Sequence, residues 1–437
     1  MTTDPFHLGL FLQGSSVQAW GEAWTGRIGE TWMRPDLFID VAKSMERACF
    51  DYILIEDASY IGESYGKSRE TYLHHGMSVP RQDPSVVATL MAAATSRIGI
   101  VPTFGTFAYP PYLLARLMAT MDQVSSGRAG WNMVTGSSDF AARNYGLDGM
   151  PEHDLRYEMA EEYIDLIRQL WAGWQPGAMV ADTDSGMLID HTKVKQIDFE
   201  GRFYTSRGPL NAGPCPQGRP VIAQAGGSAR GRQFAAKYAD TIVASVEGAD
   251  AMRAFRADVR KRMAAEGRNP DDCKVLFLIS PLMGETRADA ERLLERRSAK
   301  MSQRTDQRLA FLSKITNVDF KQFDLDTPLG EVKTNGHQQL LDDFRRKTGH
   351  MPLREAILHY DAEGGSMDFI GSPDDIASQM AEMMQHIGGD GFLVSYANMS
   401  RRTMAEIEDG LVPVLQKRGL MRKGYGHTQF RDNLLEF

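Results

Sequence analysis

The stretch "GRAGWNMVTG", residues 127–136, places a polar amide, Asn132, inside a run that otherwise has the composition of a buried strand. Buried strands of parallel sheets are near-continuous apolar runs, and a carboxamide within one costs free energy unless a partner forms hydrogen bonds with it. Glycine closes the run at both ends. The pattern predicts a strand over 129–135 and suggests that a ligand provides the partner of Asn132.

Seven further apolar runs have the length and composition of strands. They cover residues 7–12, 52–56, 98–104, 220–225, 241–245, 275–280 and 391–396. Amphipathic helical spacing separates them, most clearly at 84–95, 112–125, 156–171, 249–267 and 372–388, and again from about Met404. Eight strands alternating with helices predict an α/β fold, a single (β/α)8 TIM barrel domain over residues 1–437. A doubly wound sheet stays an alternative.

The chain of 437 residues is longer than a minimal barrel, so the surplus must lie in loops. The largest surplus, about 287–365, follows the seventh predicted strand, and we expect it to form a lid over the carboxyl mouth of the barrel. A surface insertion with no role in binding is the alternative. A second surplus, 173–219, contains "DHTKVKQIDFEGRFY" (190–204), which predicts a small hairpin.

The composition favours a small-molecule substrate. A net charge of −8 argues against a nucleic-acid or anionic-membrane surface, because those partners need clustered Lys and Arg. No stretch approaches the roughly 18 apolar residues that span a bilayer, and the start "MTTDPFHLGL" lacks the features of a signal peptide. We therefore expect a cytoplasmic protein.

The cysteines predict neither disulfides nor a metal site. Cys49, Cys215 and Cys273 are odd in number, far apart and without CxxC or Cys/His spacing. We expect three reduced structural thiols and no bound metal.

Polar side chains stand at the ends of several predicted strands. Asp57, Thr103, Asn132, Thr135 and the segment "AGGS" (225–228) all fall at the carboxyl ends. Each has an ordinary structural explanation when taken alone, such as a turn cap or a normal strand residue. Active sites of such barrels lie at this mouth, so their coincidence there favours a ligand site.

The segment "QAGGSARG" (224–231) has the features of an anion site. Its glycines let the backbone bend closely round a ligand, and Ser228 can begin a helix whose free amides suit a phosphate. It lacks the GK[ST] of a Walker loop and the glycine spacing of a Rossmann fingerprint. His153 and Tyr157, four residues apart, share one helix face that can hold a phosphate or a ring edge. An exposed first turn explains that pair equally well.

These stretches, in this order, resemble the bacterial-luciferase-like flavin monooxygenases, in particular the nitrilotriacetate and dibenzothiophene-sulfone monooxygenase group. The resemblance rests on "GRAGWNMVTG", "AARNYG", "HDLRYEMAEEYIDLIRQLWAGW", "IDFEGRFYTSRGPLNAGPCPQGRPVIAQAGGSARGRQFAAKYAD" and "FIGSPDDIASQM". It runs from about His7 to Gly391 and weakens in the expected lid and at both termini. It implies a (β/α)8 barrel that binds reduced FMN (FMNH2), supplied by a separate NAD(P)H:flavin reductase, and uses O2.

The resemblance also implies roles for individual residues. Asn132 meets the flavin ring, Asp57 and Thr103 line the isoalloxazine pocket, and Thr135 lies beside them. His153, Tyr157, Gly227 and Ser228 surround the ribityl phosphate. Trp131 is left to the core.

The chain departs from the family near the first strand. Relatives carry a glycine-rich stretch with a histidine pair there, whereas this chain reads "FLQGSSVQAWGEAW" (11–24), with Ser15, Ser16 and Gln18 in the equivalent region. The sequence therefore does not identify the residue that donates or accepts protons during catalysis. The candidates for catalysis are Asn132, Tyr60 and Ser15. Tyr60, His74 and His75 can fold over the flavin, although an exposed loop explains the histidine pair as well.

The resemblance implies a monooxygenase that oxygenates a small organic substrate through a flavin C4a-peroxide. Two alternatives stay open: a flavin- or deazaflavin-dependent reductase or dehydrogenase of the same barrel superfamily, and a non-enzymatic flavin-binding barrel. We expect a homodimer or homotetramer. The sequence identifies neither the substrate nor the nucleophilic or electrophilic character of the peroxide.

Overall fold

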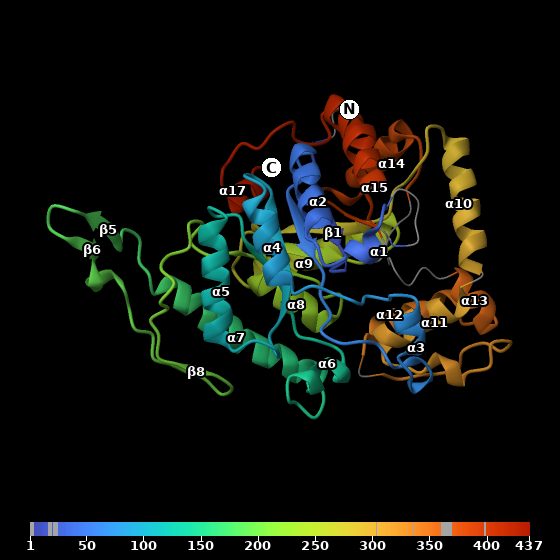
Figure 1. Ribbon diagram of the computed structural model, residues 1–437, viewed down its shortest axis with the longest axis horizontal. Coiled ribbons are helices and arrows are strands. Elements are labelled where there is room, and N and C mark those ends of the chain that lie inside the picture. The colour runs from blue at the N-terminus through green and yellow to red at the C-terminus, as the bar shows by residue number, and fades with distance from the viewer. Residues whose placement is uncertain are drawn as a thin grey trace.

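A computed structural model describes residues 4–15, 20, 25–302, 304–334, 336–359, 369–396 and 399–437 (Figure 1). Its centre is a closed barrel of eight parallel strands in the order β1-β14-β11-β10-β9-β4-β3-β2. The strands are β1 (His7–Leu12), β2 (Tyr52–Ile55), β3 (Gly99–Gly105), β4 (Gly130–Val134), β9 (Val221–Gln224), β10 (Thr241–Ala244), β11 (Lys274–Ile279) and β14 (Gly391–Ser395). The predicted TIM barrel is confirmed, and closure excludes the doubly wound sheet.

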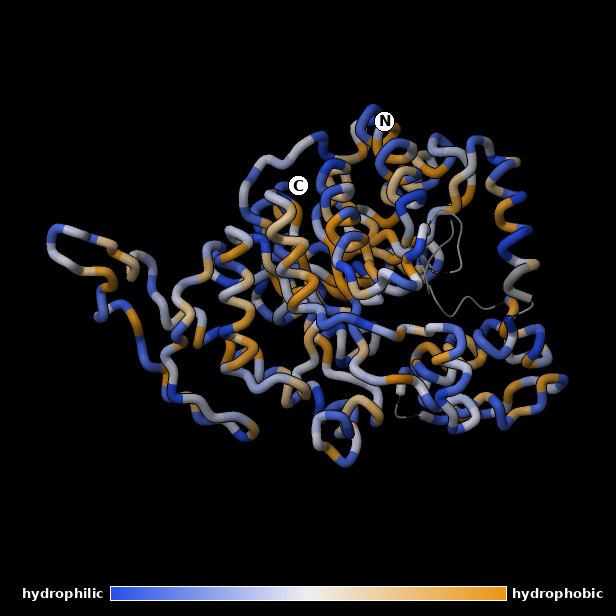
Figure 2. The backbone as a smooth tube through the Cα atoms, viewed as in Figure 1, coloured by the Kyte–Doolittle hydropathy of each residue, from blue (hydrophilic) through white to orange (hydrophobic). Residues whose placement is uncertain are grey.

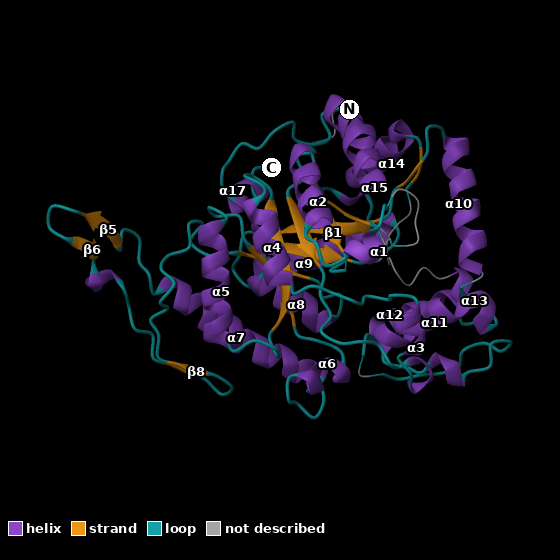
Figure 3. Cartoon of the chain, in the orientation of Figure 1, coloured by secondary structure: helices purple, strands orange, loops and turns teal. Residues whose placement is uncertain are grey.

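Helices surround the strands on all sides (Figure 3). Those of the barrel and its carboxyl-terminal part are α1 (Ile28–Thr31), α2 (Asp36–Arg47), α4 (Pro84–Ala93), α5 (Pro111–Val124), α6 (Asp139–Asn144), α7 (His153–Ala172), α8 (Ala229–Tyr238), α9 (Ala249–Ala265), α14 (Pro373–Ile387), α15 (Arg401–Ala405), α16 (Val412–Lys417) and α17 (Phe430–Leu434). A π-helical turn, Glu406–Leu411, joins α15 to α16. No helix of the described ranges is long and apolar enough to cross a membrane.

The strands form because both of their faces are buried. Every residue of β2, β9, β10 and β14 is buried, which matches the continuous apolar runs in the sequence. Apolar residues accordingly concentrate in the centre of the molecule (Figure 2). Local signals fix the helix ends, as in α14, where Ser372 and Asp375 form a capping box and Gly388 ends the helix in the left-handed region.

The insertion at 287–365 contains α10 (Arg287–Ser302), α11 (Thr305–Thr316), α12 (Gln338–Thr348) and α13 (Leu353–His359). A parallel pair of short strands, β12 (Leu282–Met283) and β13 (Ile370–Gly371), flanks it. The insertion and the segment after β2 together form a second hydrophobic core, separate from the core of the barrel. In it, Tyr65, Tyr72 and Met77 pack with residues such as Leu309, Phe320 and Phe344. In Figure 1, α11–α13 lie beside α3 (Glu70–His74).

The second surplus forms two small hairpins outside the barrel, β5 (Met179–Asp182) with β6 (Met187–Ile189) and β7 (Phe199–Glu200) with β8 (Thr205–Ser206). The hairpin predicted at 190–204 is only partly right: residues 191–193 form a 3-10 turn, and pairing begins at Phe199. The sequence did not indicate the first hairpin, because its turn "TDSG" follows no clear alternation of apolar residues.

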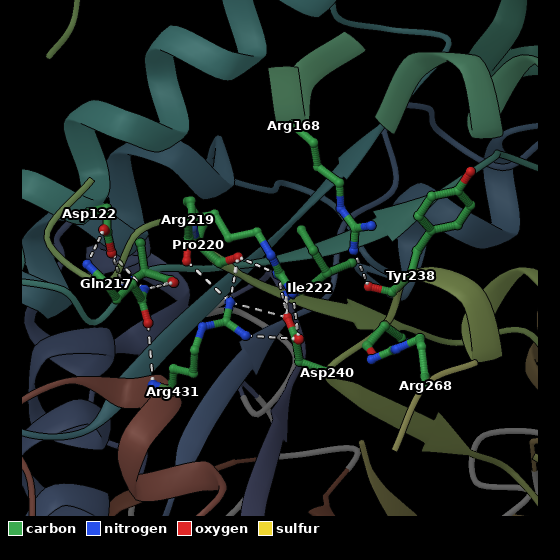
Figure 4. A network of polar contacts seen from close by, with 12 residues as sticks. Asp122, Arg168, Gln217, Arg219, Pro220, Ile222, Tyr238, Asp240, Arg268 and Arg431 are labelled. Atoms are coloured by element: carbon green, nitrogen blue, oxygen red, sulfur yellow. Dashed lines mark hydrogen bonds and ion pairs between the residues drawn. The ribbon is translucent and has the colours of Figure 1, made fainter. Parts of the chain in front are cut away.

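The amino end of the barrel is sealed by the carboxyl-terminal helix. Phe430 of α17 is fully buried with Tyr52 and Val101 in the core inside the strands. Next to it, Arg431 joins Asp240 and Arg219 in an ion-pair network (Figure 4). The predicted site residues lie at the other end of the barrel, at or after the carboxyl ends of its strands.

Candidate active site

The carboxyl ends of β2, β3 and β4 are linked by a chain of buried hydrogen bonds. Thr103 and Asn132 are register partners on neighbouring strands. The Thr103 hydroxyl donates to the Ile55 carbonyl at 2.7 Å, and Asn132 Nδ2 donates to Thr103 Oγ1 at 2.8 Å. Because the only proton of the threonine hydroxyl is used on Ile55, the hydroxyl must accept from Asn132, which fixes the orientation of the amide.

That orientation leaves the Asn132 carbonyl oxygen without a partner. The side chain is 4% exposed, and Oδ1 is buried with no hydrogen-bond donor among the described residues. An unsatisfied buried acceptor typically costs about 1–3 kcal/mol. Its neighbour Trp131 is buried in the core and donates to the Phe104 carbonyl at 3.0 Å, as predicted. Asn132 thus presents a free acceptor at the strand ends, which the N–H groups of a flavin ring can satisfy.

Charged residues gather immediately after β2. Arg81 Nη1 donates to Glu56 Oε2 at 2.5 Å and lies 3.9 Å from Asp57 Oδ1. Burial raises the pKa of Asp57 to about 6, against the opposing effect of Arg81. Asp57 is therefore a carboxyl group that can change its protonation state near neutral pH, which suits proton handling.

The insertion contributes to this end of the barrel through Lys314 of α11. The Lys314 side chain is buried and its Nζ lies 5.4 Å from the centre of the Tyr60 ring. Tyr60 in turn donates to the Lys314 carbonyl at 3.3 Å and stacks on Phe140. Burial lowers the pKa of Lys314 to about 8, although Glu56 raises it, and burial raises the pKa of Tyr60 to about 12. Tyr60 is therefore a neutral hydrogen-bonding group at ordinary pH.

The amino ends of α7 and α8 meet at a second cluster. Ser228 caps α8, accepting from the Gly231 amide at 3.0 Å, and lies 3.4 Å from His153 Nε2. Tyr157 is buried, with its ring centre 5.1 Å from that of His153. A Cβ on Gly231 would come within 2.7 Å of the Tyr157 hydroxyl, so only glycine allows this approach.

This cluster can hold a phosphate. His153, Tyr157 and Ser228, predicted from two separate observations, lie together beside the amino end of α8, where amide groups and the helix dipole favour an anion. Gly227 lies in the turn, with its carbonyl accepting from Arg232 at 2.5 Å. The residues present therefore fit a flavin phosphate here and a flavin ring at Asn132.

The other predicted residues lie as follows. Thr135 is half-buried just beyond β4. Ser15 is buried and donates to the Pro80 carbonyl at 2.6 Å, so its hydroxyl can only accept from a ligand. Ser16 and Gln18 lie outside the described residues.

His74 and His75 lie at the end of α3, and His75 has Arg304, at the start of the insertion's second helix, as a charged neighbour. The two imidazole rings pack edge to face, with their centres 4.7 Å apart.

Sequence reasoning missed four residues of the site. Gln224 ends β9, is buried, and accepts from the Gly226 amide at 2.6 Å; as a polar residue in an apolar strand it carried the same signal as Asn132. Glu56 and Arg81 stand beside Asp57, but charged residues in a loop are too common to indicate a site. Lys314 had no signal, because a single lysine in a helix ordinarily lies on the exposed face.

A closed barrel of eight parallel strands with polar side chains at their carboxyl ends is the architecture of TIM barrel enzymes. The sequence model described as luciferase-like monooxygenase matches residues 12–391. The chain belongs to the luciferase-like monooxygenase family, whose members are flavin-dependent oxidoreductases.

Relatives agree over nearly the whole length. Dibenzothiophene-sulfone monooxygenase of Rhodococcus erythropolis is 33% identical, covering 98% of this chain and 95% of the relative. Nitrilotriacetate monooxygenase component A of Aminobacter aminovorans is 32% identical, covering 91% and 89%. The crystal structure of DmoA from Hyphomicrobium sulfonivorans superposes with a TM-score of 0.87 at 28% identity, covering 99% of this chain and 93% of that one.

Proposed function

We propose that this chain is the oxygenase of a two-component system: it binds reduced FMN delivered by a separate NAD(P)H:flavin reductase and uses O2 to oxygenate a small organic molecule. The observation that carries the proposal is the buried carbonyl oxygen of Asn132, which has no donor among the described residues. Bound reduced flavin supplies the electrons that activate O2.

The residues of the chain have distinct parts in this proposal. Asn132 and Thr103 orient the ring, while His153, Tyr157 and Ser228 anchor the phosphate. Asp57 holds or releases a proton near neutral pH, and Tyr60 donates or accepts a hydrogen bond without ionising. Ser15 offers only lone pairs, because its proton is used on Pro80. The insertion lies over the mouth as a lid that excludes water.

Flavin titration tests the phosphate anchor. FMN should bind at least about tenfold more tightly than riboflavin, since each charge-assisted hydrogen bond to the phosphate contributes roughly 1.5–3 kcal/mol. Ser228→Ala should weaken FMN binding and leave riboflavin binding unchanged. Equal affinities of the wild-type protein for the two flavins would contradict the assignment.

A separate experiment tests the reductase. The chain contains no nicotinamide-binding fingerprint in its sequence, so NADH and FMN alone should give no oxygenation, whereas chemically reduced FMN should support single turnovers. Reduction of flavin by NADH at enzymatic rates would favour the dehydrogenase alternative. O2 consumption without any product other than hydrogen peroxide, over a broad substrate panel, would favour the non-enzymatic flavin barrel.

Two further expectations belong to the same proposal. We propose a cytoplasmic location, supported by three buried cysteines that are all free. We also propose a homodimer or homotetramer, supported by five exposed apolar side chains on the β5–β6 hairpin: Met179, Val180, Met187, Leu188 and Ile189. Light scattering of the purified protein measures the oligomeric state.

A further inference from the structure

The guanidinium group of Arg81 has donors that no residue in the described part of the chain accepts. Its side chain is only 7% exposed. Nη1 donates to the Glu56 carbonyl at 3.1 Å and to Glu56 Oε2 at 2.5 Å. Nε and Nη2 are buried and have no hydrogen-bond partner among the described residues. Three of the five N–H groups of this side chain are therefore withdrawn from water without an acceptor.

The unused donors form one geometric unit. Nε and Nη2 lie on the same edge of the planar guanidinium, and their N–H groups point in nearly parallel directions. That edge matches two oxygens carried by one atom, as in a carboxylate or a sulfur oxyanion. A neutral ligand with a single carbonyl oxygen would satisfy only one of the two. The free edge thus indicates an acceptor with a pair of oxygens.

With Asp57 protonated, Arg81 and the charged groups around it carry one positive charge more than they carry negative charges. Glu56 is already bound to Nη1, and Asp57 lies 3.9 Å from Nη1, beyond hydrogen-bond distance. A second buried cation, Lys314, interacts electrostatically with Glu56, Asp57 and Arg81. The two buried cations, Arg81 and Lys314, therefore lie near one ionised carboxylate, Glu56. The other carboxyl group, Asp57, becomes neutral as the pH falls through about 6.

We propose that Arg81 and Lys314 form a subsite for an anionic group of the substrate, a carboxylate or an equivalent two-oxygen anion. The subsite rests on the proposed function, because it lies among the residues assigned to the flavin end of the barrel. Its two cations come from segments far apart in the chain, the loop before α4 and the insertion. The same two residues therefore bind the anionic group of the substrate and bring the insertion next to the loop before α4.

Calorimetric titration of the FMN-loaded protein tests the subsite with matched probes, benzoate against benzamide and acetate against acetamide. Each carboxylate should bind at least about tenfold more tightly than its amide. Arg81→Lys keeps a cation for Glu56 but loses the paired edge, so it should weaken carboxylate binding about tenfold and leave amide binding unchanged. Lys314→Met should weaken carboxylate binding by about threefold or more.

The chain offers matched controls. Arg69→Lys changes an exposed arginine of the same loop region, paired with Glu63, and Lys321→Met changes an exposed lysine that lies 5.6 Å from the Tyr65 ring centre. Both should bind benzoate like the wild type. Thermal melting and FMN affinity, measured for every variant, show that each is folded and loaded.

The outcomes separate the subsite from the proposed function. Failure of the wild-type protein to bind FMN overturns the proposed function itself. Normal FMN binding with no preference for carboxylates, or with a preference that survives in a folded, FMN-binding Arg81→Lys protein, overturns the subsite alone.

Discussion

Asp240 at the amino end of the barrel and Asn132 and Arg81 at its carboxyl end differ in how completely their buried polar atoms are hydrogen-bonded. At the amino end, Asp240 is 3% exposed and receives hydrogen bonds from Arg219, Arg431 and the Ile222 amide (Figure 4). At the carboxyl end, Asn132 Oδ1 and the Nε/Nη2 edge of Arg81 are equally buried and have no partner within the described part of the chain.

Gln217 and Asn132 make this difference clear, because both are buried side-chain amides. Gln217 Nε2 donates to Asp122 Oδ1 and to the Ala129 carbonyl, and its Oε1 accepts from the Arg431 amide. Asn132 uses only its nitrogen. An amide with partners on both atoms stabilises the fold, whereas a buried amide oxygen without a donor costs free energy, which a bound ligand can recover.

The largest expected effect is at the amino end. Asp240→Ala should lower the free energy of unfolding by roughly 3–5 kcal/mol, because it leaves two partly buried guanidinium groups without their carboxylate. Burial alone raises the pKa of Asp240, but Arg219 and Arg431 outweigh it and hold the pKa well below its usual range. Urea denaturation measures the change. The control Asp271→Ala, which removes an exposed partner of Arg260, should cost at most about 1 kcal/mol.

The second effect separates the two amides. Asn132→Leu should reduce FMN affinity at least about tenfold, roughly 1.4 kcal/mol, with little change or a slight gain in the stability of the flavin-free protein. Gln217→Leu should do the reverse, with a clear loss of stability and normal FMN affinity. If the Asn132→Leu protein is less stable without ligand yet binds FMN normally, this amide serves the scaffold and the ring has been placed wrongly.

The smallest effect is a pH dependence at the anionic subsite. The charged and titratable groups facing it are Glu56 and Asp57 after β2, Tyr60, Arg81 and Asp83 before α4, and Lys314 from the insertion. Burial raises the pKa of Glu56, but Arg81 and Lys314 outweigh it and hold the pKa below its usual value, so Glu56 stays ionised. Asp57, with a pKa of about 6, and Lys314, with a pKa of about 8, change charge between pH 5 and pH 9.

Both changes oppose an anion as the pH rises, since Asp57 gains a negative charge and Lys314 loses a positive one. Benzoate affinity should therefore fall about threefold as the pH rises through 6 and again through 8. Lys314→Met should abolish the step near pH 8, and Asp57→Asn the step near pH 6, as measured by calorimetry on FMN-loaded protein. Benzoate affinity independent of pH in the wild-type protein would contradict a role for these two groups.

Much of the fold followed from periodicity. All eight strands lie where apolar runs predicted them, β1 with identical bounds, because strands buried on both faces are mostly apolar. For the same reason Asn132 was recognisable as a candidate. His153, Tyr157 and Ser228 were predicted because helix starts and glycine turns have local signatures.

The sequence by itself determined the barrel, the end at which its polar residues gather and the position of the insertion. Burial produces a local pattern of apolar residues, and helix caps need particular residues within one turn, so both can be recognised from residues close together in the chain. Only the tertiary structure decided that Lys314 reaches Glu56 across some 250 positions of chain, that the insertion shares a core with Tyr65 and Tyr72, and that Arg81 keeps a free edge. These features depend on which distant groups a folded chain brings together and which hydrogen bonds remain unmade, and no local pattern records either.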